Sequence, residues 1–257
     1  MGSTICAGQV YCAIESDRRK LLLRPTSTDA IIVAEVLVKQ SYAPLLVILE
    51  QLSISVRTVV DAGANIGTFT LFIKEAFPEA TVIAVEPEAE NFRLLTMIVA
   101  ANSLFRVHAV RAALWKENAL LWIQESFRGS RERELSFTVA SVKPSIPDSS
   151  ELVVEGITVD ALLDRYGLEV VDIFKMDIEG AEASIFGSPA AISAFFRRVR
   201  VCAIEIHDEV FDRMSFLRAV DELGLQHVQS GETLYIYGSN VANPEASATM
   251  SDSAALP

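Results

Sequence analysis

Short apolar runs alternate with helical segments through the middle of this chain, and this alternation limits the possible folds more than any other feature of the sequence. Residues 58–62 (TVVDA) and 81–85 (TVIAV) are rich in β-branched side chains, as are strands buried on both faces of a parallel sheet. Helical spacing of apolar residues follows the first run, and Pro87 favours a helix over residues 88–101. This βαβα order predicts right-handed crossovers and a doubly wound, mostly parallel α/β sheet.

The alternation continues toward the carboxyl end of the chain. Strands are predicted at residues 106–114, 170–176 and 199–206, and helices at residues 158–165 and 188–196. Residues 226–230 and 233–237 flank the pair Gly231-Glu232, which has the loop length and glycine placement of a β-hairpin. The last two strands are therefore expected to be antiparallel.

These elements indicate one main domain with additions at both ends. We assign residues 1–57 to an N-terminal helical cap, residues 58–238 to the main domain and residues 239–257 to a disordered tail without aromatic residues. Residues 124–150 hold four basic residues and two prolines without clean periodicity, so we expect a lid or an irregular loop there. The basic side chains either face solvent or recognise an anionic group of a substrate.

The charge balance and the cysteines exclude several partners and sites. The 257 residues carry a formal net charge of −12, which is poorly suited to neutralising the phosphates of a nucleic acid. The three cysteines have neither zinc-site spacing nor a paired framework, so a cytoplasmic protein is expected. No basic segment leads into an apolar stretch within residues 1–20, so no secretory signal is predicted.

The most apolar stretch, residues 30–49, is interpreted as two amphipathic helices. Glu35, Lys39, Gln40 and Pro44 interrupt it, and each charge would cost roughly 2.5–3.5 kcal/mol at the centre of a bilayer. We therefore expect neither a membrane span nor a membrane partner.

The turn after the first predicted strand is the strongest candidate for a ligand site, because ligands of open α/β sheets bind beyond the carboxyl ends of the strands. Gly63 permits a tight turn and the close approach of a ligand, and Gly67 permits close packing where the next helix begins. The G-x-x-x-G spacing lacks the middle glycine of nicotinamide and flavin sites. A turn entered through Asp61 is better suited to a ligand with a cationic or amino-acid end.

The second predicted strand ends in Glu86. A carboxylate at this place accepts two hydrogen bonds from a ribose diol. An adenosine with a cationic amino-acid arm is S-adenosylmethionine, so the two strand ends together predict binding of this nucleoside.

Four segments, in this order and spacing, resemble the FkbM family of S-adenosylmethionine-dependent methyltransferases: VVDAGANIGTFT, VIAVEPEAENFRLL, ITVDALLDRYGLEVVDIFKMDIEGAEASIF and CAIEIHDE. The resemblance covers about residues 42–209. It implies the class I methyltransferase fold, a Rossmann-like seven-stranded sheet with an antiparallel C-terminal hairpin. Family members are mainly O-methyltransferases of sugars, polyketides and other small metabolites, so we expect a small-molecule acceptor that is methylated on a hydroxyl group.

The resemblance also implies the residues of the cofactor site. The expected set is Asp61, Gly63, Ala64, Asn65 and Gly67 at the methionine part, Glu86 and Pro87 at the ribose, and Ala112 and Ala113 at the adenine. Asp177, at the end of a further predicted strand, is expected to serve both the cofactor and catalysis.

Polar residues at two strand ends are the candidates for catalysis. Asp177 follows one predicted strand, and Glu205 and His207 end the next one, on the same face because side chains alternate along a strand. His207 is a candidate to take a proton from a substrate hydroxyl, although a lone histidine is more often an ordinary hydrogen-bonded residue. The three residues also suit a divalent cation such as Mg²⁺, but their spacing alone does not predict a metal.

Two further residues are expected to contact the substrate. Tyr42 lies before the first strand, where it can close over the site. Glu179 and Glu182 share a helix face, where acidic side chains are also favoured by the helix dipole, and Glu179 is the one assigned to the substrate.

Three other functions stay open. N-methylation of a small amine would need the same alignment of donor and acceptor. A protein that binds S-adenosylmethionine without catalysis would keep Asp61 and Glu86 but need no base. A nicotinamide oxidoreductase would be expected to have the middle glycine that the turn after the first strand lacks. A homo-oligomer stays open as well.

Overall fold

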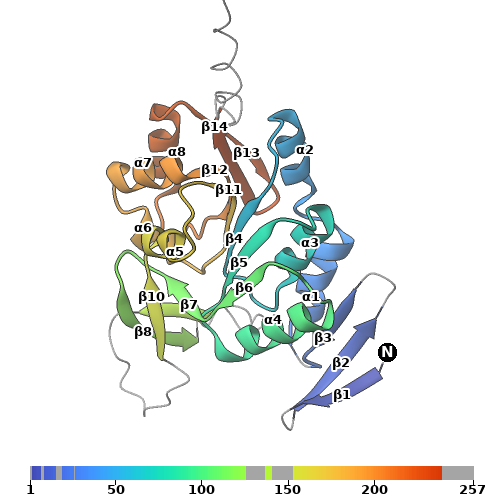
Figure 1. Cartoon of the computed structure of the whole chain (residues 1–257). Helices are drawn as coiled ribbons and strands as arrows, with labels where there is room; N and C mark the ends of the chain where they lie inside the picture. Colours follow the sequence, from blue (N-terminus) through green and yellow to red (C-terminus); the bar gives the residue numbers. More distant parts are fainter. Residues whose placement is uncertain are drawn as a thin grey trace, which may run out of the picture.

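The centre of the protein is a seven-stranded sheet. The computed structural model describes residues 2–6, 9–15, 19–25, 27–125, 137–140 and 153–238, and the sheet lies within them. Its strands are β4 (Thr58–Ala62), β5 (Thr81–Val85), β6 (Val107–Val110), β11 (Val171–Met176), β12 (Val199–Glu205), β13 (Leu225–Ser230) and β14 (Thr233–Gly238). Their order across the sheet is β13-β14-β12-β11-β4-β5-β6 (Figure 1). β14 runs opposite to the other six strands of this sheet. The predicted doubly wound sheet and its antiparallel hairpin are confirmed.

Helices cover both faces of the sheet (Figure 1). One face carries α1 (Asp29–Val33), the π-helix η1 (Ala34–Val38), α2 (Ala43–Gln51), α3 (Thr68–Ala76) and α4 (Ala89–Ala101). The other carries α5 (Val159–Arg165), α6 (Glu182–Ile185), α7 (Pro189–Arg198) and α8 (Arg213–Glu222). Neighbouring strand residues enter opposite cores, as Val59 and Val60 do. Burial on both faces explains why the parallel strands are continuous apolar runs.

Local signals predict most boundaries of the central elements. β4 and β5 occupy the predicted residues, and the Ser188 side chain caps α7 as expected. α4 begins at Ala89, because the Glu88 side chain accepts a hydrogen bond from the Asn91 N–H at 2.7 Å. Pro87 therefore precedes the helix instead of lying in its first turn.

The single strand predicted at residues 106–114 is two strands. β6 stays in the central sheet, whereas β7 (Ala112–Leu114) leaves it to pair with β10 (Val153–Ile157). β10 pairs with β8 (Ala119–Glu125), and β8 pairs with β9 (Phe137–Ala140). The prediction of a lid or an irregular loop at residues 124–150 is therefore wrong for the end of β8 and for β9, which are strands. The rest of that segment, with its four basic residues, and the expected tail at residues 239–257 lie outside the described residues.

The N-terminal segment begins with strands instead of helices. β1 (Gly2–Cys6), β2 (Gln9–Glu15) and β3 (Lys20–Leu23) form an antiparallel sheet. Asn102, which ends α4, accepts a hydrogen bond from the Lys20 N–H at 2.8 Å and donates one to the Lys20 carbonyl oxygen at 2.7 Å. The prediction of a helical cap over residues 1–57 is therefore wrong for β1, β2 and β3. It is correct for α1, η1 and α2. β3 is held by a partner far along the chain.

The segment Asp29–Gln51 has the length and composition of a membrane-crossing helix, with a mean hydropathy of 1.7 over its most apolar window, of which 22% is buried. It bends near Gln40, whose φ is 53°, between η1 and α2. Leu45, Ile48 and Leu49 of α2 belong to the core on one face of the central sheet. The absence of a membrane span stays a prediction.

Candidate functional site

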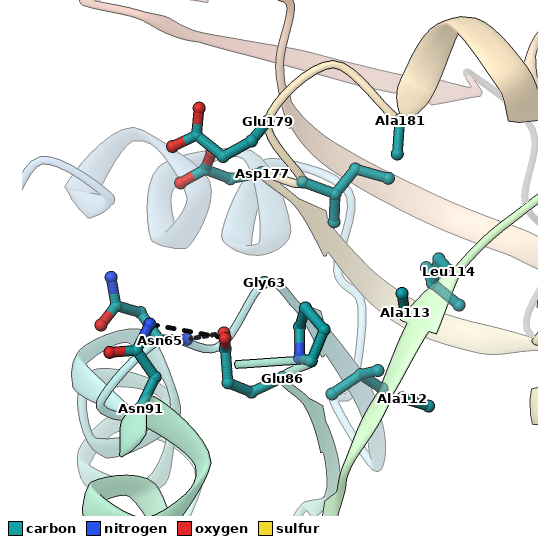
Figure 2. Close-up of a pocket in the computed structure, with 13 residues that line it drawn as sticks. Gly63, Asn65, Glu86, Asn91, Ala112, Ala113, Leu114, Asp177, Glu179 and Ala181 are labelled. Atoms are coloured by element: carbon teal, nitrogen blue, oxygen red, sulfur yellow. Dashed lines mark hydrogen bonds between the residues drawn. The ribbon is translucent and has the colours of Figure 1, made fainter. Parts of the chain in front are cut away.

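A cavity of about 70 Å³ lies at the carboxyl ends of β4, β5 and β11, where the strand order of the sheet reverses (Figure 2). The turn after β4, the end of β5, strand β7 and the segment after β11 surround it. Its lining residues are Gly63, Asn65, Val85, Glu86, Pro87, Asn91, Ala112, Ala113, Leu114, Asp177, Ile178, Glu179 and Ala181.

Gly63 follows β4 and lies next to the segment that follows β11. Its φ is +72°, and a Cβ atom on it would lie 1.8 Å from the Asp177 carbonyl oxygen. The Asp177 N–H donates to the Ala62 carbonyl oxygen at 3.1 Å, which holds the two strand ends together. A glycine was expected here to let a ligand approach the turn. The structure shows that the backbone of Asp177 already requires it. Gly67 begins α3 with φ +91°, and a Cβ there would lie 2.7 Å from Leu95 Cδ1, so the close packing predicted for it is confirmed.

Glu86 joins two turns at the edge of the cavity. One carboxylate oxygen accepts a hydrogen bond from the Asn65 N–H at 2.8 Å (Figure 2), and the other accepts one from the Glu88 N–H at 2.9 Å. Burial raises the pKa of Glu86 to about 7 against these hydrogen bonds. A carboxylate has further lone pairs, so Glu86 can still accept hydrogen bonds from a ribose.

The structure brings most of the predicted cofactor residues together. Those that line the cavity are Gly63, Asn65, Glu86, Pro87, Ala112, Ala113 and Asp177. Asn91, Leu114, Ile178 and Ala181 line it as well and were not predicted. Asn91 and Ala181 follow strand ends by several residues, so only the path of the chain after each strand reveals them.

Asp61 and Lys175 form a buried ion pair behind this cavity. They are partners in the β4–β11 register, and Lys175 Nζ lies 3.6 Å from Asp61 Oδ1 and 3.7 Å from Asp177 Oδ2. Lys175 also donates to the Gly63 carbonyl oxygen at 2.7 Å, and Asp61 accepts from the Thr70 hydroxyl at 2.6 Å. Asp61 is fully buried and does not line the cavity. Its position therefore departs from the expected contact with the methionine part and supports the turn instead.

Lys175 is a candidate that inspection of strand ends misses, because it lies within β11. Burial lowers its pKa, but the neighbouring charges, with Asp177 the largest, outweigh burial and raise the pKa above its ordinary value. A single lysine in an apolar strand is the sequence signal that could have identified it, since a buried charge requires a partner.

A second cavity of about 320 Å³ adjoins the first. The two share Gly63, Asn65, Asp177 and Glu179, which we call the shared wall. Tyr42, which was expected to contact the substrate, lines the second cavity and packs edge-on against Phe69, with ring centroids 4.7 Å apart.

The second cavity has an acidic lining. Glu35, Glu205 and Glu232 add carboxyl groups to those of the shared wall. Ala64 also lines this cavity, whereas Gly67 lines neither. The cavity thus offers room and negative charge beside the site predicted for the cofactor.

The backbone of the shared wall is unusual at two positions. Asn65 and Glu179 have φ values of 50° and 55°, in the left-handed region. Asparagine tolerates this conformation, but glutamate adopts it at a cost. Such residues concentrate at functional sites, so the backbone conformation supports this wall as part of a site.

His207 lies beside the shared wall and is 4% exposed. Its Nε2 atom lies 3.4 Å from Glu179 Oε2 and 3.9 Å from Glu205 Oε1, and its Nδ1 atom lies 3.3 Å from Glu182 Oε1. Burial lowers the pKa of His207, but the carboxyl groups of Glu179 and Glu182 outweigh it and raise the pKa to about 10. The ring therefore holds its proton at neutral pH, which argues against the hypothesis that it takes one from a substrate.

Glu205 differs from an ordinary surface carboxylate. Burial and then the charge of Asp177 raise its pKa to about 8. The charge of Asp177 thus disfavours the ionised form of Glu205, and a cationic group between the two side chains would relieve that repulsion.

A family model places this site in a known family. The model of the methyltransferase FkbM domain matches residues 61–229. The chain belongs to the FkbM methyltransferase family. The resemblance stated for the four segments is confirmed, and the FkbM match contains every lining residue of the first cavity.

Two curated proteins are similar to this FkbM domain. Methyltransferase 1 of Beauveria bassiana (strain ARSEF 2860) is 26% identical over 145 residues, which are 49% of this chain and 56% of that protein. Methyltransferase sdnD of Sordaria araneosa is 29% identical over 150 residues, which are 49% of this chain and 58% of that protein. The chain matches little more than half the length of these relatives.

Solved structures align with most of the FkbM chain at low identity. Precorrin-6y C5,15-methyltransferase from Geobacter metallireducens GS-15 is 13% identical, with 74% of this chain and 84% of that chain covered and a TM-score of 0.40. A SAM-dependent methyltransferase from Aquifex aeolicus is 13% identical, with 74% and 86% covered and a TM-score of 0.39.

Proposed function

We propose that this protein transfers a methyl group from S-adenosylmethionine to a hydroxyl group of a small molecule. The observation that carries the proposal is the shared wall, which joins a cavity at the strand switch point to a larger one beside it. A methyl donor in the first cavity and an acceptor in the second would meet at this wall.

The first cavity has the chemistry that this cofactor requires. Glu86 presents a carboxylate to a ribose diol, and the small side chains of Ala112 and Ala113 leave space for a flat ring. Asp177 and Glu179 add negative charge that matches a sulfonium and an amino group. When bound, the cofactor supplies an activated methyl group on its sulfonium.

The second cavity would hold the acceptor between Tyr42 and the acidic wall. Asp177 of this wall and Glu205, which lines only the second cavity, would accept a hydrogen bond from the acceptor hydroxyl and take its proton as the methyl group passes from the sulfonium to the oxygen and leaves a neutral thioether. Orienting two reactants contributes roughly 7–11 kcal/mol, whereas a positioned base contributes on the order of 10²–10⁴-fold, so the main task of these residues is alignment.

N-methylation of a small amine is the second candidate. Glu35 and Glu232 enlarge the acidic lining, and such a lining attracts an ammonium group. A protein that only binds S-adenosylmethionine would have no use for the second cavity.

We further propose that the protein is cytoplasmic and has no nucleic-acid or membrane partner, because of its net charge of −12 and its cysteine pattern.

Two assays test the proposal in sequence. Calorimetric titration of EDTA-treated protein is expected to show saturable binding of S-adenosylmethionine and none of NADH. Methyl-labelled cofactor is then incubated with a pool of polyols and phenols or with a pool of small amines, with and without divalent metal salts. Label in the first pool supports O-methylation, and label in the second supports the amine candidate. Binding of NADH alone would contradict both.

A further inference from the structure

Three side chains beside the shared wall form a group of their own. Asp177, Glu205 and His207 each offer a ligand atom, and these atoms lie within 4.8 Å of one another. We propose that this group binds a divalent first-row transition metal ion, with Mn²⁺ as the ion to test.

The register of the sheet fixes the two carboxylates. Met176 of β11 pairs with Ile204 of β12, so Asp177 and Glu205, the next residues along two parallel strands, lie side by side. His207 follows two residues later, and its Nε2 atom lies 3.9 Å from Glu205 Oε1. The ligands thus lie at or just after strand ends, which are more rigid than long loops and favour metal binding.

The His207 ring lies with a buried carboxyl group behind one of its nitrogens. It is 4% exposed, and its buried Nδ1 atom forms no hydrogen bond with any described residue, although it lies 3.3 Å from Glu182 Oε1. Glu182 is itself fully buried. In metal sites a carboxylate behind one ring nitrogen fixes the tautomer and leaves the other nitrogen to the ion. Here Nε2 faces both Glu179 and Glu205, at 3.4 and 3.9 Å from their carboxylate oxygens, so an ion bound to Nε2 would displace the ring proton on that side.

The charges around the group favour a cation. Lys175 lies within 4 Å of two carboxyl groups, and His207 lies within 4 Å of three more. Lys175 and His207 supply at most two positive charges to these five carboxyl groups, and burial together with the charge of Asp177 raises the pKa of Glu205. A divalent ion between Asp177 and Glu205 would favour the ionised form of Glu205. The carboxyl groups are those of Asp61, Asp177, Glu179, Glu182 and Glu205.

The donor set indicates the kind of ion and its use. Two carboxylates and an imidazole combine oxygen and nitrogen donors, which suits Mn²⁺ or a similar ion better than Ca²⁺. Asp177 and Glu205 both line the second cavity, so open coordination positions would face the acceptor. This use rests on the proposed function: with Asp177 and Glu205 as its ligands in place of proton acceptors, the ion would hold the acceptor oxygen and lower the pKa of its hydroxyl group, whose proton would pass to water.

Electron paramagnetic resonance of Mn²⁺ tests the site without an activity assay. EDTA-treated full chain is expected to take up Mn²⁺ at one site, with loss of the signal of the free aqueous ion. Glu182→Gln replaces the carboxylate behind the ring by an amide whose oxygen can still accept the hydrogen bond of the Ile178 N–H, and it should weaken uptake by roughly 10–100-fold. Glu205→Gln removes a ligand and should weaken it at least as much.

Glu35→Gln is the matched control, because it removes a carboxylate from the lining of the same cavity but not from the group of three. It should take up Mn²⁺ like the wild type, and circular dichroism and S-adenosylmethionine binding verify that each variant folds. Failure of the wild type to bind Mn²⁺, or the same uptake in Glu35→Gln, Glu182→Gln and Glu205→Gln, would overturn the metal site. Either result leaves the proposed function standing, whereas Mn²⁺ uptake without S-adenosylmethionine binding would overturn that function and keep the site.

Discussion

At the scale of single residues, the charge of Glu86 connects protein electrostatics to cofactor binding. Its pKa of about 7 places the change from carboxylic acid to carboxylate between pH 6 and pH 8. A ribose diol donates to the carboxylate more strongly than to the acid, so affinity for S-adenosylmethionine should rise by up to roughly tenfold over this range. Calorimetric titration at the two pH values measures this change.

Glu86→Gln provides the control for this pH dependence. The amino group of the cofactor titrates with both proteins, so only the difference between them reports Glu86. The stability of the fold should change with pH in the opposite direction. Because the folded pKa lies above the ordinary value of 4.5, the free energy of unfolding should fall as the pH rises from 4.5 to about 7. Equal pH dependence of cofactor affinity in wild type and variant would exclude Glu86 as the titrating group.

Lys175 is expected to determine whether the ends of β4 and β11 can stay together. Lys175→Met leaves Asp61, which is fully buried, and Asp177 without the cation that lies 3.6 and 3.7 Å from them. Loss of one partner from a buried ion pair costs about 3–5 kcal/mol. Urea unfolding at pH 7 should show a decrease of that size.

Asp61→Asn in the Lys175→Met background tests the cause of that decrease. Removal of the uncompensated charge should restore part of the free energy of unfolding, since the remaining amide can still interact with Thr70. If the double variant is no more stable than Lys175→Met, lost packing and not charge is the reason.

At the scale of elements, the β4–α3 turn depends on the absence of one side chain. Gly63→Ala places a methyl group 1.8 Å from the Asp177 carbonyl oxygen at φ +72°. Gly167→Ala has a similar φ of +64° but meets no atom within 4 Å, so it carries only the left-handed cost of roughly 1–2 kcal/mol. We expect Gly63→Ala to lower the free energy of unfolding by more than about 4 kcal/mol, measured by urea unfolding. Similar losses in both variants would show that the strand ends move apart easily.

The elements also show how far local patterns reach. β4, β5 and the final hairpin could be predicted because burial on two faces and a two-residue glycine turn are local properties. β7 and β10 are a parallel pair whose partners lie far apart in sequence, and no local pattern specifies that pairing. β3 depends in part on a distant partner too, since Asn102 binds it, whereas β1–β2 and β2–β3 join neighbouring segments, whose local pattern could have revealed them.

At the scale of the whole molecule, the net charge of −12 should make stability depend on salt. An increase from about 10 mM to about 150 mM NaCl shortens the screening length from about 30 Å to about 8 Å and weakens repulsion among the acidic groups. We expect the melting temperature to rise by about 2–4 °C, the shift that about 1 kcal/mol produces in a chain of this size. KCl should act alike. A fall would mean that surface ion pairs, such as those of Arg198 with Asp160 and Asp164, outweigh the repulsion.

The sequence by itself determined the alternation of strands and helices, the family, and the positions of Gly63, Glu86 and Asp177, because these depend on local periodicity and on strand ends. Only the tertiary structure decided the charge states. Asp61 meets Lys175 through the register of two strands far apart in sequence, and His207 meets Glu182 across the fold. A pKa depends on the burial of a group and on the charges within a few ångströms of it, and neither is set by neighbours along the chain.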